Sequence, residues 1–353
     1  MYKNNLKSSK TWVITLLLSV MIFLILIITF NTFVDPNWSF NHSNRFNAVQ
    51  VSSNFRKSKA NYLKYKPDTY NTLLLGSSRI EFINQEHFNE KTFNYGVPSA
   101  AYQEFESIID FVIEQQDGIE LEKIIIGLDF FITREENGAD IYNQSLLTEA
   151  LTNVSDDSFR YKELLSIDTF FNSIENSYYS LNKYFGSDKN ISYRNRNNVG
   201  FAKKYSVKET EDNMKKRIEF FRNTRYDESY IYNTNYKEEL FILKNKYPNT
   251  EFVVFTNPIT IELFETLKEE NKEDEFKRWI RETVEVFGEV HNFIGNNSVT
   301  SDKENYQDSD HYYPHVGDYI TYYLDGKLNE VPSDFGTEIN KENIDEELSK
   351  LFH

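Results

Sequence analysis

Two stretches of the 353-residue chain carry the side chains that a serine-dependent acyl transfer needs. One is residues 76–79, which reads Gly-Ser-Ser-Arg, and the other is residues 308–315, which contains two aspartates and two histidines. A serine nucleophile requires a base to take its proton, a carboxylate to orient that base, and N–H donors for the oxyanion. We therefore expect these two stretches to meet in the folded protein.

Short apolar runs, each suited to a buried strand, must position these side chains. They lie at residues 73–75, 92–94, 124–127, 252–255 and 290–294. Residues 105–112 carry apolar side chains at the i, i+3, i+4 and i+7 positions of a helix, and a charged helix is expected over 264–287. Short apolar strands separated by helices are typical of a parallel sheet covered on both faces. We therefore predict an α/β fold, with residues 134–235 as one long insertion.

The residues directly after each strand are the candidates for binding and catalysis, because ligands of such sheets bind beyond the carboxyl ends of the strands. The Gly-Ser-Ser-Arg turn follows the first strand, Gly96 follows the second, and Asp129 follows the third in the triplet Gly-Leu-Asp. The sequence thus places serine, arginine and aspartate at one edge of the predicted sheet.

The N-terminal region predicts a membrane anchor. Residues 12–34 contain no charged side chain, and a helix of this length spans a hydrocarbon core of about 30 Å. Three lysines precede the segment: Lys3, Lys7 and Lys10. The positive-inside rule then places residues 1–11 in the cytoplasm and residues 35–353 outside the cytoplasm. The alternative is a cleaved signal peptide, whose apolar region is usually shorter, and residues 30–38 contain no small-x-small cleavage site.

Composition excludes several functional classes. The chain carries 39 basic and 55 acidic side chains, a net charge of −16, so it would repel nucleic-acid phosphates and we expect no nucleic-acid partner. Cysteine is absent, which excludes disulfide scaffolds, thiolate zinc sites and cysteine nucleophiles. Aromatic residues make up 16% of the chain, which favours a packed globular structure over disorder.

This order of motifs resembles the SGNH hydrolases, also called the GDSL family. The family nucleophile lies in a Gly-Asp-Ser turn after the first strand, and the match selects Ser78 rather than Ser77. The family's Asp-x-x-His block matches Asp308 and His311. The resemblance therefore implies a triad of Ser78, His311 and Asp308. It also implies an oxyanion hole made by the backbone N–H groups of Ser78 and Gly96, since Gly96 matches the glycine of the second block.

The resemblance extends over about residues 70–325 and implies an architecture. It predicts a flavodoxin-like sheet of about five parallel strands with helices on both faces in residues 70–328. The anchor at 12–34 and a stem at 35–69 precede this domain, and residues 329–353 are expected to form an acidic tail. The anchor and the motifs GSSR, GLDFF and DSDHYYPHVGD resemble, more narrowly, a group of membrane-anchored extracytoplasmic SGNH proteins. That group is related to the D-alanyl-teichoic-acid protein DltD and to polysaccharide O-acetylation proteins.

A serine esterase or O-acyltransferase is the activity that the resemblance implies. Its substrates would be acyl groups of an envelope polysaccharide or teichoic-acid-like polymer, and a multipass membrane acyltransferase is an expected partner. No cofactor and no metal is expected. The alternative is a catalytically degenerate SGNH domain that binds polymer or serves as a scaffold in a biosynthetic complex.

One position departs from the family pattern. The third block of the family is Gly-x-Asn, whose Asn side chain donates to the oxyanion, but this chain has Asp129. An ionised carboxylate cannot donate a hydrogen bond. Either Asp129 has another role, such as binding Arg79 or the stem, or the oxyanion hole uses backbone N–H groups alone. Arg79 suits a phosphate or carboxylate of the substrate and, equally, a structural ion pair.

Residues 308–315 allow more than one arrangement. Asp308 precedes His311 by three residues and can face it across a single turn. The adjacent Asp310 is expected to point away from His311 in an extended surface loop. The same carboxylate and imidazole groups, together with His315, would also suit a metal-dependent hydrolase.

Overall fold

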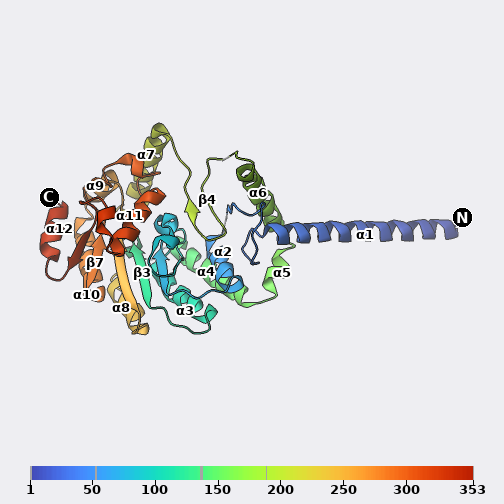
Figure 1. The fold of residues 1–353 in the computed structure, drawn as a ribbon, viewed down its shortest axis with the longest axis horizontal. Coiled ribbons are helices and arrows are strands. Elements are labelled where there is room, and N and C mark those ends of the chain that lie inside the picture. The colour runs from blue at the N-terminus through green and yellow to red at the C-terminus, as the bar shows by residue number, and fades with distance from the viewer. Residues whose placement is uncertain (1, 52–53, 136–137, 188, 353) are drawn as a thin grey trace. The chain divides into compact units, whose positions relative to one another are not determined.

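A six-stranded, mostly parallel sheet lies at the centre of the larger part of the chain in the computed structural model (Figure 1). The strand order is β2-β1-β3-β6-β7-β8, and only the β7–β8 pair is antiparallel. The strands are β1 (Thr72–Gly76), β2 (Thr92–Asn94), β3 (Lys123–Leu128), β6 (Glu251–Thr256), β7 (Glu289–Asn292) and β8 (Thr337–Asn340). The short strands β4 (Tyr193–Arg194) and β5 (Gly200–Phe201) lie outside this sheet. The predicted α/β class is confirmed.

The chain divides into two units. The structure describes residues 2–51, 54–135, 138–187 and 189–352. The first unit comprises residues 1–66, 150–189 and 194–196, and the second unit, which contains the sheet, comprises residues 67–149, 190–193 and 197–353. Residues 134–235, which we expected to form one insertion, therefore contribute to both units.

The central strands form where the sequence is apolar at consecutive positions. All three leucines of β1, residues 73–75, are completely buried, and so are most of the isoleucines of β3 beside them, residues 124–126. A strand that is buried on both faces belongs to a parallel sheet covered by helices, which explains why these runs do not alternate with polar residues. Because β2 and β3 pair with opposite edges of β1, the chain reverses its direction of progress across the sheet at β1.

The sheet has one strand more than we expected. β8 lies in residues 329–353, the segment that we expected to be an acidic tail, and it pairs with β7. Ile339 of β8 is buried opposite Val290. The following helix, α12 (Ile344–Phe352), packs the ring of Phe352 against two other buried rings. The tail prediction is wrong because a few well-spaced apolar residues among many acids are sufficient to fold this segment.

Helices surround the sheet (Figure 1). The helices of the second unit are α3 (Phe105–Gln115), α7 (Val207–Thr224), α8 (Tyr236–Lys246), α9 (Ile261–Glu269), α10 (Glu273–Phe287), α11 (Pro314–Leu324) and α12, and α4 (Gly138–Ser155) crosses the division between the units. Short 3₁₀ helices are η1 (Ser78–Phe82), η2 (Gln85–His87), η3 (Tyr102–Glu104), η4 (Phe130–Thr133), η5 (Lys303–Asn305) and η6 (Leu328–Glu330). The single helix expected over 264–287 is in fact two, because Asn271 adopts a positive φ of 56° that ends α9.

The first unit begins with α1 (Tyr2–Val34). Its residues Ser9–Val34 form a 26-residue stretch that contains an 18-residue window of mean hydropathy 3.1, long and apolar enough to cross a membrane. The other helices of this unit are α2 (Phe55–Tyr65), α5 (Phe159–Glu163) and α6 (Ile167–Tyr184). Directly after α1, Asp35 accepts hydrogen bonds from two backbone N–H groups and pairs with Arg196 at 2.7 Å. The stem therefore contains a helix and a buried ion pair.

Candidate active site

The turn after β1 presents Ser78 and uses Ser77 for structure. Ser77 is buried, and its hydroxyl accepts a hydrogen bond from the backbone N–H of Arg79, which caps the start of η1. Ser78 is the first residue of η1, and its side chain is only partly buried. The cap thus fixes the turn so that the second serine faces the edge of the sheet.

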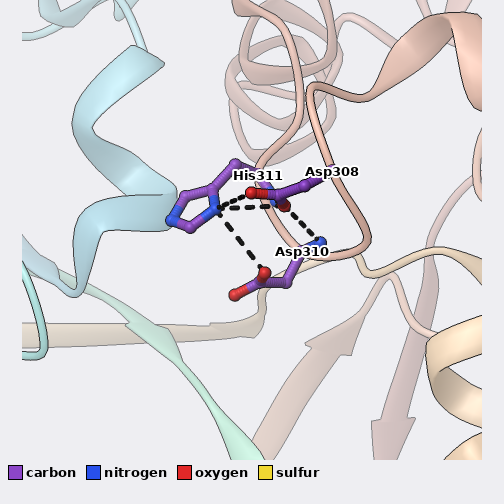
Figure 2. A group of neighbouring side chains, drawn as sticks. All are labelled: Asp308, Asp310 and His311. Atoms are coloured by element: carbon purple, nitrogen blue, oxygen red, sulfur yellow. Dashed lines mark hydrogen bonds and ion pairs between the residues drawn. The ribbon is translucent and has the colours of Figure 1, made fainter. Parts of the chain in front are cut away.

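The three predicted triad residues form a hydrogen-bonded chain in which His311 lies between Ser78 and Asp308. Ser78 Oγ is 2.9 Å from His311 Nε2, and Nδ1 on the other side of the ring is 2.9 Å from Asp308 Oδ2. Figure 2 shows His311 with both nearby aspartates. Asp308 Oδ1 also accepts the backbone N–H groups of Asp310 and His311, at 2.9 and 2.8 Å. The carboxylate therefore orients the imidazole and holds its own loop at the same time.

Glycines at the strand ends let the Ser78 turn lie close to the sheet. A Cβ at Gly96 would come within 2.5 Å of Ile80 Cγ1, and one at Gly127 within 2.6 Å of Ile80 Cγ2. Gly76 passes so near the carbonyl of Gly127 that a Cβ there would lie 2.8 Å from it. The side chain of Ile80, two residues after Ser78, thus fills the space that these glycines leave open. A larger residue at any of these positions would push the turn outward.

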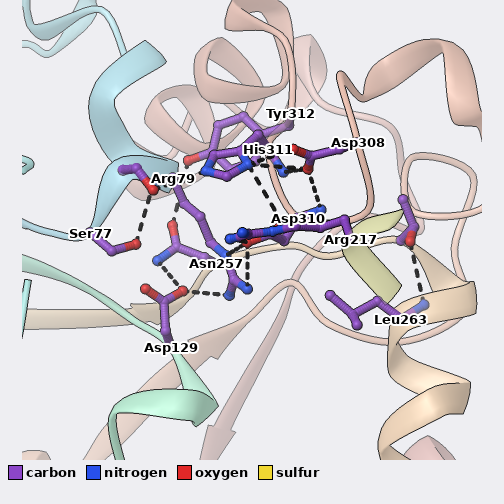
Figure 3. A network of polar contacts seen from close by, with 12 residues as sticks. Ser77, Arg79, Asp129, Arg217, Asn257, Leu263, Asp308, Asp310, His311 and Tyr312 are labelled. Carbon is purple, nitrogen blue, oxygen red and sulfur yellow. Dashed lines mark hydrogen bonds and ion pairs between the residues drawn. The ribbon is translucent and has the colours of Figure 1, made fainter. Parts of the chain in front are cut away.

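Arg79 lies in a buried ion-pair network beneath the histidine (Figure 3). Its guanidinium is 2.6 Å from Asp129 Oδ1 on one side and 3.2 Å from Asp310 Oδ2 on the other. Arg217 of α7 binds the same Asp310 through two bonds, at 2.5 and 2.9 Å. Asn257, directly after β6, donates to Asp129 at 3.0 Å. Residues from five separate parts of the chain therefore form one network of ion pairs and hydrogen bonds.

The burial of Arg79, Asp129 and Asp310 distinguishes between the roles that the sequence left open for them. The side chains of Arg79, Asp129 and Asp310 are exposed by only 3%, 1% and 1%. Arg79 is thus engaged in a structural ion pair on both sides, and Asp129 is its partner. Asp310 does not lie in a surface loop, and its Oδ1 is 3.5 Å from His311 Nδ1 rather than pointing away. A peptide turn at residues 308–311 brings both carboxylates to the same face of the ring.

The network sets the charge of the histidine. Burial alone would lower the pKa of His311, but the carboxylates of Asp310 and Asp308 raise it to about 9. Burial would likewise raise the pKa of Asp310, yet the positive charges of His311, Arg79 and Arg217 hold it well below its usual range. The raised pKa favours the imidazolium form at neutral pH, in which Nε2–H donates to Ser78 Oγ.

The backbone N–H of Gly96 already has an acceptor. It donates to Asn94 Oδ1 at 2.8 Å, and the amide nitrogen of Asn94 donates to the carbonyls of Ile80 and Ile83. Asn94 therefore ties the end of β2 to the Ser78 turn. An oxyanion role for Gly96 stays a prediction, since its N–H would have to turn from Asn94 to the substrate.

A metal is poorly suited to the acidic cluster. Among the described residues, Asp308, Asp310 and His311 have ligand atoms within 4.8 Å of one another. Both oxygens of Asp310 already accept hydrogen bonds from guanidinium groups, whose positive charges oppose a cation there. His315 lies outside the group and contacts Asn305 at 2.8 Å.

A cavity of about 600 Å³ lies beyond the His311 loop. Its walls are largely apolar and include the rings of Tyr205, Tyr306, Tyr313 and His315. Tyr313 fixes one wall by accepting the backbone N–H of Tyr205 at 3.1 Å. Ser78 and His311 do not line this cavity, which adjoins the His311 loop through Tyr313, Pro314 and His315.

Sequence reasoning missed three members of the site: Arg217, Asn257 and the buried role of Asp310. Asn257 could have been predicted, because it lies shortly after the fourth apolar run, and residues that follow the strands of such a sheet are candidates for binding and catalysis. Arg217 gave no such signal, since it is one of many charged residues on a long amphipathic helix.

Comparison with known proteins adds no assignment to this geometry. No protein-family model matches the sequence, and no curated protein matches it at a significant level.

Proposed function

We propose that the protein is a membrane-anchored serine esterase or O-acyltransferase acting on O-acyl groups of a cell-envelope polysaccharide or teichoic-acid-like polymer. The observation that carries the proposal is the hydrogen-bonded path from Ser78 through His311 to Asp308, with 2.9 Å at each step. A serine, an imidazole and a carboxylate in this order are the groups that perform acyl transfer on many unrelated folds.

An SGNH-type, flavodoxin-like sheet is part of the same proposal. Counted in chain order, the first five strands of the sheet lie in the order 2-1-3-4-5, which is the flavodoxin-like order. In such sheets the ligand binds where the strand order reverses, between β1 and β3. Ser78 follows β1 and Asp129 follows β3, so the position of the proposed nucleophile supports this fold family.

The proposed reaction has two stages. Ser78 Oγ attacks the acyl carbonyl and gives its proton to His311 Nε2, which passes that proton to the departing hydroxyl oxygen. The acyl group is then an ester of Ser78. In the second stage His311 takes a proton from water or from a sugar hydroxyl, that oxygen attacks the ester, and the proton returns to Ser78. Asp308 stabilises the imidazolium that forms in each stage.

The resting charge of the site imposes a condition on this mechanism. His311 must lose a proton before it can accept one from Ser78, and its pKa of about 9 makes the neutral form a minority at pH 7. The small neutral fraction of His311 at pH 7 also favours the alternative function, a degenerate SGNH domain that binds polymer without turning it over. The hydrogen bond that the N–H of Gly96 already donates to Asn94 favours the same alternative.

Labelling with a fluorophosphonate probe separates the two functions. The wild type should label increasingly from pH 7 to pH 10, whereas Ser78→Ala should not label at any pH. Ser77→Ala is the matched control, because it removes the cap of η1 but not the proposed nucleophile, and it should keep labelling with a loss of stability of about 1 kcal/mol. Absence of wild-type labelling at pH 10 would exclude the enzyme and leave the scaffold.

The topology belongs to the proposal as well. We infer that α1 anchors the chain with its lysine-bearing N-terminus in the cytoplasm and residues 35–353 outside. An envelope polymer would then reach the site, and a multipass acyltransferase in the same membrane would supply acyl groups. Protease added outside spheroplasts should digest residues 35–353, and the intact protein should resist a high-salt wash. Recovery of a soluble form trimmed near residue 34 would contradict the anchor.

A further inference from the structure

Helix α6 has its polar and apolar faces inverted. Its buried residues are all small or amide-bearing polar ones: Thr169, Ser173, Asn176, Ser177 and Ser180. The exposed charged residues of the helix are Asp168, Glu175 and Lys183. Beside them lies an apolar stripe, in which Ile167, Phe171, Ile174 and Tyr178 are exposed by 72, 61, 45 and 53%. These four residues are spaced i, i+4, i+7 and i+11, which places them in one stripe along the helix. A helix that faces water has the opposite arrangement.

The inverted helix lies at the end of the apolar helix α1. The rings of Phe30 and Phe170 pack edge to face at 5.9 Å. Asn31 donates to the carbonyl of Leu164 and accepts from the hydroxyl of Ser173, both at 2.9 Å. α1 is therefore joined to the N-terminal half of α6 through an aromatic contact and a buried amide that both donates and accepts, which fixes the position of α6 relative to α1.

The contact between Phe30 and Phe170 also indicates how deep α6 lies relative to the end of α1. Phe30 precedes the end of α1 at Val34 by four residues, which at the helical rise corresponds to about 6 Å. Figure 1 shows α6 running away from the end of α1 at a steep angle rather than alongside it. Interfacial helices lie in the plane of the membrane surface, with their apolar face buried about 5–10 Å into the boundary between headgroups and acyl chains. The depth of α6 relative to the apolar end of α1 falls in this range.

We propose that α6 lies in the interfacial layer of the lipid bilayer and inserts its stripe of Ile167, Phe171 and Ile174 among the acyl chains. The inference rests on α1 as a membrane anchor, as in the proposed function, and is independent of catalysis. It explains the inversion, because the polar side chains then face the protein interior, where all of them except Ser177 are hydrogen-bonded, and the apolar ones face lipid. The first unit would thereby be held to the membrane surface at two points rather than one.

Several neighbouring residues favour lipid over a protein partner on this face. The ring of Phe170 packs on Phe30 of α1 and also on Phe171 of the stripe, so ring contacts join the stripe to the anchor. Tyr184 and Phe185, at the far end of α6, are 61 and 75% exposed. Aromatic side chains of this kind gather at membrane interfaces. Arg45 lies 6.0 Å from the Tyr184 ring, where it suits the headgroup layer.

The absence of cysteine allows a direct test with single-cysteine variants carrying a nitroxide spin label. The full-length protein is reconstituted into phosphatidylcholine vesicles, and collisions of each label with oxygen, which dissolves in lipid, and with a water-soluble nickel chelate are measured. The test positions are Phe171→Cys and Ile174→Cys. The controls are Leu18→Cys in α1 for lipid and Asp345→Cys for water, the latter with an 85% exposed side chain. Ser177→Cys on the buried face of α6 reports a protein environment.

We expect labels at 171 and 174 to collide with oxygen as the label at 18 does, and at least about tenfold less with the nickel chelate than the label at 345. Collisions like those at 345 would overturn the inference while leaving the anchor intact. Shielding from both reagents, as at 177, would overturn it in favour of a second copy of the chain. Nickel access at position 18 would remove the anchor and the inference together. Variants labelled at 171, 174 and 345 must melt within a few degrees of the wild type, which their exposed positions favour.

Discussion

Replacing Asp308 by asparagine should change both the rate of acyl transfer and its dependence on pH. In the wild type, His311 has a pKa of about 9, so about 1% of it is neutral at pH 7 and the rate should rise nearly tenfold per pH unit up to pH 9. Asp308→Asn removes the carboxylate that lies 2.9 Å from Nδ1, while Asp310 at 3.5 Å remains. Both the charge and the orientation of the imidazole are affected.

The size of each effect follows from these distances. Loss of one opposite charge at such range lowers a pKa by about one unit or more, which brings that of His311 toward about 8 and makes about 10% of it neutral at pH 7. Loss of orientation should lower the limiting rate at least about a hundredfold, or a few kcal/mol of transition-state stabilisation. The deficit of Asp308→Asn should therefore be about a hundredfold at pH 10 but only about tenfold at pH 7.

The assay is the rate of fluorophosphonate labelling or of aryl acetate hydrolysis between pH 6 and 10.5. A matched control is Asp318→Asn, which removes another carboxylate hydrogen-bonded to a histidine, His87, at 2.8 Å. This variant should keep the wild-type profile. A wild-type midpoint near 6.5, or a deficit that is the same at every pH, would refute the argument that the two carboxylates keep His311 charged.

Three other changes test the charge network. Arg217→Met should move the pH–rate midpoint to higher pH with little change in the limiting rate, because a cation near His311 is lost, and Arg222→Met on the same helix should not. Arg79→Met should lower the free energy of unfolding in urea by about 3–5 kcal/mol, since two buried carboxylates each lose one cationic partner. Arg278→Met removes a half-exposed guanidinium from an i,i+4 pair and should cost under about 1 kcal/mol. The raised pKa of His311 contributes stability that is complete below about pH 6.5, the ordinary pKa of histidine, and is lost as the pH rises through about 9. The Tm of the wild type should therefore fall between pH 7 and pH 10 by more than the Tm of His311→Gln.

The local parts of the site could be predicted from short stretches of sequence. The Gly-Ser-Ser turn, the apolar strand before it and the Asp-x-x-His spacing are each contained in a few residues. Hydrogen bonds such as that between Asp308 and the backbone N–H of His311 are local consequences of this spacing. Residues that join the site from a distance were harder to find. Arg217 lies 93 positions from Asp310, and no local pattern marks one arginine among many on α7.

Two wrong expectations have the same physical cause. The C-terminal segment was expected to be an acidic tail because its composition is charged, yet Ile339 pairs into the sheet and Phe352 packs into the core. Asp310 was expected at the surface because it lies in a polar loop, yet two arginines bury it. The composition of a segment indicates only whether its residues are mostly polar or mostly apolar. Whether a given residue is buried depends on the partners that the rest of the chain supplies.

The sequence by itself determined the α/β class, the apolar N-terminal helix and the residues of the turn and loop that carry Ser78, Asp308 and His311. These features follow from periodicity, length and local hydrogen bonding, which act over a few residues. Only the tertiary structure decided that Arg79 and Asp129 form a buried pair and that two carboxylates raise the pKa of His311. Charge interactions depend on the distance and burial of groups from separate elements, and a linear sequence contains neither quantity.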